Sequence, residues 1–419
     1  MKNISRLSAA IFMFFAVTRI TAADRLTVTL GNSLKASRIE MVEVDASVVR
    51  SRLGTSEFIV TDADGREVAS QQTYDGKLIF QAGIPAKGKS VYYIAKGTPS
   101  VYDNKVFGRQ FPERVDDIAW ENDRVAFRCY GPALQKSGER AWGYDVWNKR
   151  TSKLVVEERY RNELDPSLSA ATRRLRELGH ADLADDVYNA VSYHVDHGNG
   201  MDCYKVGPTL GCGTSALLVG KDRRIAYPHC YKEFQILDMG PLRFTVRLVY
   251  PAESIDGTEV TETRVLSLDA GSQLNKVTVT YDGLERALPI ASGIVVHKEN
   301  PTAFIMNPKD GYMCYEDLGD PTQYKEKYRE AQNKDFGSIY VGVVMPQPVS
   351  RMYFLEEEGL PGATGHILAT VENRTSLTYY FGSGWSRNAE TGFDSLLSWE
   401  AYLHRFASQV RTPISVRIK

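Results

Sequence analysis

The chain has 419 residues, of which 43% are hydrophobic and 25% are charged, so it can form two or three domains or one large β domain with an appendage. Its 51 lysines and arginines balance 52 aspartates and glutamates, which leaves a net charge of -1. A balanced charge gives no long-range attraction to nucleic acid or to an anionic membrane, so we expect neither as a partner. The 23 tyrosines fit either half-buried strands or a sugar-binding β protein.

The first 23 residues predict a secretory signal peptide. Lys2 and Arg6 precede the apolar run of residues 7–17, and small residues end the segment at Ala23. This order of charged, apolar and small residues is typical of an export signal, with cleavage expected near Ala23. The apolar run is too short to span a bilayer. We therefore expect a periplasmic or secreted protein without membrane insertion.

Residues 24–98 are expected to form a small N-terminal β-sandwich. Short runs such as RLTVTLGN and RIEMVEVD alternate apolar and polar side chains, which is the pattern of a strand with one buried face. The sequences DADG and YDGK separate such runs and are typical of hairpin turns.

Residues 99–419 are expected to form a large antiparallel β-sandwich with a few helices, so the predicted fold class is mainly β. The long run VTETRVLSLDAGSQLNKVTVTYD predicts two strands joined by the turn DAGS. A helical insert is expected at about residues 165–190, with Ser167 or Ser169 as its N-cap and Gly179 as a stop. A second helix is expected in DSLLSWEAYLHRFASQV, packed on the sandwich.

Five cysteines occur in the sequence, and their odd number leaves at least one thiol unpaired. Cys203 and Cys212 bracket a short segment and could close it with a disulfide, which an oxidising compartment permits. The alternative is that the cysteines are buried thiols that pack as small hydrophobic side chains.

Residues 193–207, YHVDHGNGMDCYKVG, contain the strongest candidate site. Histidine beside a carboxylate can act as a general acid or base near neutral pH. Glycines in this segment allow a tight turn that brings its second half back toward the histidines. The candidate catalytic residues are His194, Asp196, His197, Asp202 and Tyr204. His194, Asp196 and His197 could instead hold a divalent metal ion, and no other cofactor is indicated. The alternative is a set of turn residues that bond to backbone groups.

Residues 140–150, RAWGYDVWNKR, form a second candidate region. Tryptophan faces suit the C–H groups of sugar rings, and arginine or lysine can hold a uronate carboxylate. An equally good interpretation is a buried aromatic anchor with a solvated basic rim. A lone strand histidine, His297, is more typical of a packed core residue. The candidate substrate-binding residues are Arg140, Trp142, Tyr144, Asp145, Trp147, Lys205, His229, Trp385 and Arg387.

The segments AWGYDVWNKR, YHVDHGNGMDCYKVGPTLGCG and YYFGSGWSRN, followed by SWEAYLHRFA, resemble a family of exported bacterial proteins described as a domain of unknown function, DUF4861. The resemblance covers most of the mature chain, and the central motif is specific. It implies a large β domain similar to the galactose mutarotase-like supersandwich. Members are commonly encoded beside enzymes that degrade pectin-like and other uronic-acid polysaccharides, which implies a carbohydrate role. The resemblance supplies no catalytic assignment, and the insert at about residues 165–190 departs from the common pattern.

We therefore expect an exported enzyme that acts on uronic-acid-containing oligo- or polysaccharides, with an acidic oligosaccharide as its partner. A lyase would use His194 or His197 as base and Tyr204 as acid, with Lys205 and Arg140 on the carboxylate. A glycoside hydrolase would use Asp196 or Asp202 with Asp145. The alternative is a noncatalytic periplasmic carbohydrate-binding protein. No GxSxG, HExxH, P-loop or dinucleotide motif occurs, and the sequence does not determine the oligomeric state.

Overall fold

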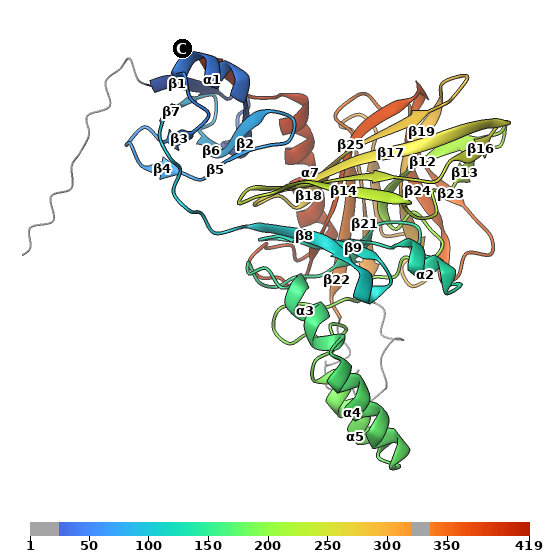
Figure 1. The fold of residues 1–419 in the computed structure, drawn as a ribbon. Coiled ribbons are helices and arrows are strands. Elements are labelled where there is room, and N and C mark those ends of the chain that lie inside the picture. The colour runs from blue at the N-terminus through green and yellow to red at the C-terminus, as the bar shows by residue number, and fades with distance from the viewer. Residues whose placement is uncertain (1–24, 320–335) are drawn as a thin grey trace, which may run out of the picture.

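The structure, a computed structural model, describes residues 25–319 and 336–419 (Figure 1). The predicted signal peptide lies outside the described residues. The fold is mainly β, built from several antiparallel sheets and few helices, which confirms the predicted fold class. In the described ranges, no helix is both long enough and apolar enough to cross a membrane.

A small unit of two sheets lies at the blue end of the chain in Figure 1. Strand β1 (Arg25–Gly31) illustrates why this unit forms. Every second side chain of its sequence RLTVTLG is buried in the core of the unit. The five-stranded sheet has the order β26-β1-β7-β3-β4 and the three-stranded sheet has the order β2-β6-β5. The remaining elements are β2 (Arg38–Asp45), α1 (Ala46–Leu53), β3 (Phe58–Thr61), β4 (Glu67–Val68), β5 (Ser70–Gln72), β6 (Lys77–Ile84), β7 (Lys89–Lys96) and β26 (Ser415–Ile418).

The last strand of the chain, β26, belongs to the sheet of the small unit. It pairs antiparallel with β1, with Val28 opposite Ile418 and Gly31 opposite Ser415. From the sequence these residues were expected in the large unit, because a strand's own pattern does not reveal its partner. The two ends of the described chain therefore meet in one sheet.

A four-stranded sheet with the order β11-β10-β9-β8 and a nine-stranded sheet form one part of the large unit. In the nine-stranded sheet, β17 and β18 pair antiparallel on either side of the predicted turn DAGS, which confirms that hairpin. The strands of these two sheets are β8 (Val106–Phe111), β9 (Asp117–Asn122), β10 (Ala126–Cys129), β11 (Asp145–Trp147), β14 (Glu233–Met239), β15 (Arg243–Val249), β16 (Glu253–Ile255), β17 (Thr258–Asp269), β18 (Leu274–Asp282), β20 (Phe304–Asn307), β21 (Tyr312–Leu318), β22 (Ser338–Val344) and β25 (Ser376–Trp385).

A five-stranded sheet with the order β13-β12-β19-β24-β23 completes the large unit. One hydrophobic core joins it to the other two sheets, with Trp120, Phe244, Val277, Ile294 and Phe381 among its members. Strand β19, read as LPIASGIVVH, is buried at almost every position because both of its faces are covered. The strands of this sheet are β12 (Cys212–Val219), β13 (Arg224–Ala226), β19 (Leu288–His297), β23 (Arg351–Glu356) and β24 (Ala363–Arg374).

The predicted helical insert forms two helices, α4 (Pro166–Glu177) and α5 (Ala181–Asn189), which project from the body of the molecule in Figure 1. The N-cap of α4 is Asp165, whose carboxylate accepts from the Ser167 amide at 2.8 Å, so neither predicted serine caps it. A carboxylate at this position also interacts well with the helix dipole. The other helices are α2 (Pro132–Lys136), α3 (Val156–Glu163), α7 (Leu396–Arg411) and the short 3-10 turn η2 (Pro112–Arg114).

The predicted C-terminal helix is α7, which packs on the nine-stranded sheet through Trp399 and Leu403. All five cysteines are free thiols, so Cys203 and Cys212 do not form the disulfide that was one of the two expectations. Four of the five are buried, in agreement with the alternative that they pack as small hydrophobic side chains.

Candidate functional site

The candidate segment 193–207 runs between α5 and β12 without regular secondary structure. Its two halves meet as predicted, because the Asp202 amide donates to the Tyr193 carbonyl at 2.9 Å. Gly200 has a φ of 105°, and a Cβ at this position would lie 2.1 Å from the Asn148 carbonyl oxygen. Only glycine therefore allows this segment to lie so close to Asn148, the residue that follows β11.

Asp202 and Asp145 lie in the interior, where they share one guanidinium. Arg128 donates from Nε to Asp145 at 2.8 Å and from Nη2 to Asp202 at 2.7 Å. Tyr130 donates its hydroxyl to Asp145 at 2.9 Å. We call Arg128, Tyr130, Asp145 and Asp202 the Arg128 network. Burial raises the pKa of Asp145 to about 7, although Arg128 opposes this shift.

His194 lies beside the Arg128 network, with its side chain 29% exposed. Its Nδ1 is 3.1 Å from the Asp202 carbonyl oxygen and 3.8 Å from the Asp202 carboxylate. A carbonyl oxygen only accepts, so Nδ1 carries the proton and Nε2 is the basic nitrogen of the neutral ring. The Tyr193 ring packs against the imidazole at 4.6 Å between centroids. His194 is therefore a partly exposed imidazole with a fixed tautomer, as a general base requires.

Asp196 and His197 face other partners. The Asp196 carboxylate accepts from Arg150 at 2.9 Å and from the Gly198 and Gly200 amides, so it holds the turn together. Burial raises its pKa, but these bonds outweigh burial and the pKa of Asp196 is lowered. His197 Nε2 is 3.0 Å from the Ser192 carbonyl oxygen. His194, Asp196 and His197 thus do not converge, and within residues 25–319 and 336–419 no three His, Cys, Asp or Glu side chains are placed to hold a metal ion.

Tyr204 lies in the core next to a second histidine–carboxylate pair. Its ring is 6.0 Å from that of His297, whose Nδ1 is 3.0 Å from the Asp317 carboxylate. The His297 amide donates to the Tyr315 hydroxyl at 3.1 Å. Burial raises the pKa of Tyr204 far above its usual value. Tyr204 is therefore a neutral, buried phenol.

Strand β11 and the residue before it carry three of the candidate binding residues into the core. Tyr144, which precedes it, stacks on Phe381 with 4.4 Å between ring centroids. Trp147 lies 4.8 Å from the rings of both Tyr160 and Tyr193. Tyr144, Asp145 and Trp147 are all buried because β11 pairs with β10 and other elements cover both of its faces. Their arrangement matches the buried aromatic anchor and leaves no surface on which a sugar could stack.

A separate group of aromatic side chains stays partly exposed. Trp142 packs against Tyr227 at 4.9 Å and against His229 at 5.1 Å between ring centroids. Tyr227 donates to Glu357 at 2.9 Å. We call Trp142, Tyr227 and His229 the aromatic patch. Arg140 is exposed two residues before Trp142.

Three arginines contact segment 193–207, and Lys205 lies within it. Arg114 donates to the Tyr193 hydroxyl at 3.2 Å, and Arg387 is 3.6 Å from the Asp196 carboxylate. The side chains of both arginines are 25% exposed. Arg150 is exposed, Lys205 is half-buried, and Trp385 is buried with its indole N–H bonded to the Phe336 carbonyl at 2.8 Å. Arg114 also lies 3.9 Å from the Asp117 carboxylate, and guanidinium groups such as these can bind a carboxylate of a substrate.

Four residues of these clusters were not predicted from the sequence: Arg114, Arg128, Tyr130 and Asp317. A signal existed for Arg128, because the run RVAFRCYG places a charged residue among apolar strand positions that are otherwise buried. Such a charge needs a partner in the interior. Asp317 gave no comparable signal, since its partner His297 lies on another strand 20 residues away.

The fold and the site together define a protein of several antiparallel β-sheets with a histidine-bearing segment beside a buried ion network. The chain belongs to the family described as Domain of unknown function (DUF4861), whose model matches residues 30–416. The family resemblance is thereby confirmed. A relative, "Uncharacterized protein P7" from Formosa agariphila, is 24% identical over 443 residues, which cover 98% of each chain.

Two solved structures from Enterococcus faecalis align with most of the chain. One is an alpha-mannosidase, with 9% identity and a TM-score of 0.48 over 94% of this chain and 46% of that one. The other is a protein in the Glycosyl Hydrolase Family 38, with 8% identity and a TM-score of 0.46 over 95% of this chain and 48% of that one. The chain spans about half the length of each.

Proposed function

We propose that the protein is an exported carbohydrate-active enzyme that acts on uronic-acid-containing oligosaccharides, with His194 as its general base. The observation that carries this proposal is the fixed tautomer of His194, whose Nδ1 is 3.1 Å from a carbonyl oxygen while the side chain stays 29% exposed. Arg114 and Arg387, each 25% exposed, contact the segment that carries it, Arg114 at the Tyr193 hydroxyl and Arg387 at the Asp196 carboxylate. A base on a segment that arginines contact suits a substrate with a carboxylate.

Elimination fits these residues better than hydrolysis. An arginine on the uronate carboxylate acidifies the C5 proton. His194 Nε2 removes that proton, the electron pair of the C5–H bond forms the C4–C5 double bond, and the C4–O bond breaks. The leaving oxygen takes a proton from water, and His194 later returns its own proton to the solvent. Hydrolysis by Asp145 and Asp202 would need two accessible carboxylates. Both are buried and bonded to Arg128.

A noncatalytic carbohydrate-binding role is the second candidate, and the aromatic patch favours it. Trp142 and His229 are both at least partly exposed, and their rings lie 5.1 Å apart. Aromatic faces of this kind bind sugar rings without any chemistry. In that case, the His194 segment would have only a structural role.

Incubation with a panel of uronate oligosaccharides tests the proposal. We expect the absorbance of the unsaturated uronate to rise, and His194→Ala to slow this rise by ~100- to 10,000-fold because the base is lost. Binding of the oligosaccharide should persist in that variant. His180→Ala is the matched control, since His180 is exposed on the helical hairpin.

The readouts separate the alternatives. New reducing ends without the absorbance rise would mean hydrolysis. An unchanged rate in His194→Ala, with His197→Ala inactive, would move the base to His197. Binding of the panel with no product at any pH would favour the noncatalytic role. Full activity after chelator treatment would remove the metal hypothesis.

A further inference from the structure

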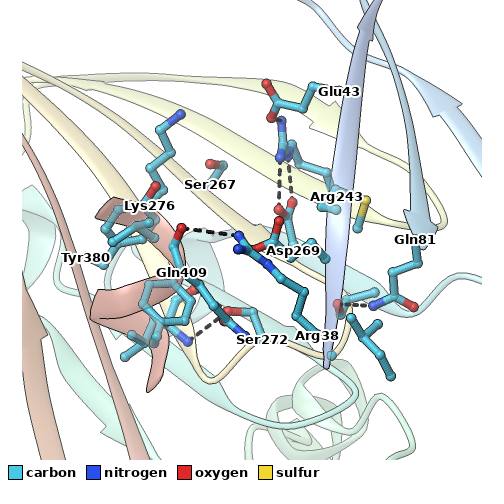
Figure 2. A pocket seen from close by; sticks show the side chains of 18 of the residues that line it. Arg38, Glu43, Gln81, Arg243, Ser267, Asp269, Ser272, Lys276, Tyr380 and Gln409 are labelled. Atoms are coloured by element: carbon cyan, nitrogen blue, oxygen red, sulfur yellow. Dashed lines mark hydrogen bonds and ion pairs between the residues drawn. The ribbon is translucent and has the colours of Figure 1, made fainter. Parts of the chain in front are cut away.

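A cavity of about 760 Å³ lies between the small unit and the large unit. Its walls come from β2 of the small unit, from β17, β18 and β25 of the large unit and from α7 (Figure 2). Small-molecule sites typically occupy roughly 300–1,000 Å³. The cavity shares no lining residue with the His194 site described above.

The lining of the cavity carries more positive than negative charge. Its cations are Arg38, Lys105, Arg124, Arg243, Lys276 and Arg405, and its carboxylates are Glu40, Glu43, Asp123 and Asp269. Three of the carboxylates are already neutralised, because Glu40 pairs with Arg38, and both Glu43 and Asp269 pair with Arg243. Figure 2 shows Asp269 bonded to Arg243.

Of the other cations, Arg124 lies 3.9 Å from the Asp123 carboxylate, and the remaining three are available to a ligand. Lys105, Lys276 and Arg405 are exposed, and across the described ranges no ion pair is formed by any of the three. Lys276 on β18 lies beside Ser267 and Tyr380 on the neighbouring strands (Figure 2). An anion in the cavity would therefore meet ammonium and guanidinium groups that have no competing carboxylate.

Aromatic rings form another wall of the same cavity. Tyr380 packs edge-on against Phe406 at 5.1 Å, and Phe406 lies 6.2 Å from Tyr402 between ring centroids. All three are half-buried, so part of each ring stays accessible. The hydroxyl of Ser267 and the amide of Gln409 add polar groups to this lining. Rings, hydroxyls and cations together are the chemistry that recognises an acidic sugar chain.

We propose that this cavity is a second, noncatalytic binding site for an anionic oligosaccharide. The choice of ligand class rests on the proposed function, whereas the charge and shape of the cavity do not. A site between the two units would hold a long substrate at a second point and raise its local concentration near the enzyme. The ligand class is a sugar chain that carries carboxylate or sulfate groups, because both groups offer the cavity the same negative charge.

Calorimetric titration of the full chain tests this site, with a uronate oligosaccharide, a sulfated oligosaccharide and a neutral one as the probes. Both charge-reversal variants, Lys276→Glu and Arg405→Glu, should weaken binding of an acidic probe at least about tenfold. Lys221→Glu is the matched control, since Lys221 is an exposed residue in the turn between β12 and β13. All titrations are repeated in His194→Ala, which removes catalysis and keeps the cavity.

The outcomes for the two proposals differ. Weaker acidic-probe binding in the cavity variants, with no product from the wild type, would support the cavity site and contradict the proposed enzyme. Normal product formation with unchanged binding in both cavity variants would overturn the cavity site alone. Equal binding of the neutral probe, or no binding of either acidic probe, would also overturn the cavity site.

Discussion

Arg128 brings together carboxylates that lie 57 positions apart in the sequence, Asp145 and Asp202. The three side chains are almost completely buried. Removing charges from water is costly, and their mutual attraction offsets this penalty only while all partners are present. Because Asp202 also bonds to His194 through its carbonyl oxygen at 3.1 Å, the Arg128 network supports the segment that carries the proposed base.

Arg128→Met is therefore expected to lower the free energy of unfolding by roughly 3–5 kcal/mol, because two carboxylates remain buried without their cation. Denaturant titration measures this difference. Arg174→Ala is the control, since its pair with Glu177 is exposed and should be worth less than ~1 kcal/mol. A loss in Arg128→Met as small as in the control would show that water reaches the two carboxylates.

At the scale of elements, the His297–Asp317 pair connects two sheets. His297 ends β19 of the five-stranded sheet, and Asp317 lies on β21 of the nine-stranded sheet. Burial lowers the pKa of His297, but Asp317 at 3.0 Å outweighs burial, so the pKa of His297 is raised. Folding therefore favours the protonated imidazole.

This shift predicts a pH-dependent stability. A raised pKa in the folded state gives a stabilisation that is complete below the unfolded pKa, about 6.5, and that is lost as the pH rises through the folded pKa. The free energy of unfolding of the wild type should exceed that of His297→Asn by more at about pH 6 than at about pH 9. His180→Asn, an exposed histidine, is the control. A pH-independent difference between wild type and His297→Asn would contradict the role of the ion pair.

At the scale of the whole molecule, the C-terminal residues connect the small unit to the large unit. Strand β26 extends the sheet of β1, and Ile414 and Ile418 pack on the core of the small unit. Arg38 on β2 donates to the Thr412 carbonyl at 2.8 Å, just beyond α7. The small unit thus depends on residues that are nearly 400 positions away in the sequence.

Removing residues 415–419 should lower the free energy of unfolding by roughly 2–4 kcal/mol, through lost backbone hydrogen bonds and lost apolar burial. Differential scanning calorimetry would record the change as a lower or separate transition of the small unit. Val416→Thr is the control, because Val416 is 37% exposed and keeps its backbone bonds to β1. An unchanged transition after the truncation would mean that β26 adds nothing to the sheet.

The sequence by itself determined the elements whose signal is local. Alternation over RLTVTLG, the turn DAGS, the helical spacing in LLSWEAYLHRF and the family motifs all depend on residues within a few positions of one another. The mainly β class and the family followed from these patterns. The sequence also identified segment 193–207 as unusual, because its histidines, carboxylates and glycines are contiguous.

Only the tertiary structure decided what those residues do. It buried Tyr144, Asp145 and Trp147 in the core, and it turned His194 and His197 toward different carbonyl oxygens. It also paired Arg128 with Asp202 and His297 with Asp317, and it closed a cavity between the two units. Each of these facts depends on which strands become neighbours, and strand pairing is set by packing across the whole chain, which no local pattern encodes.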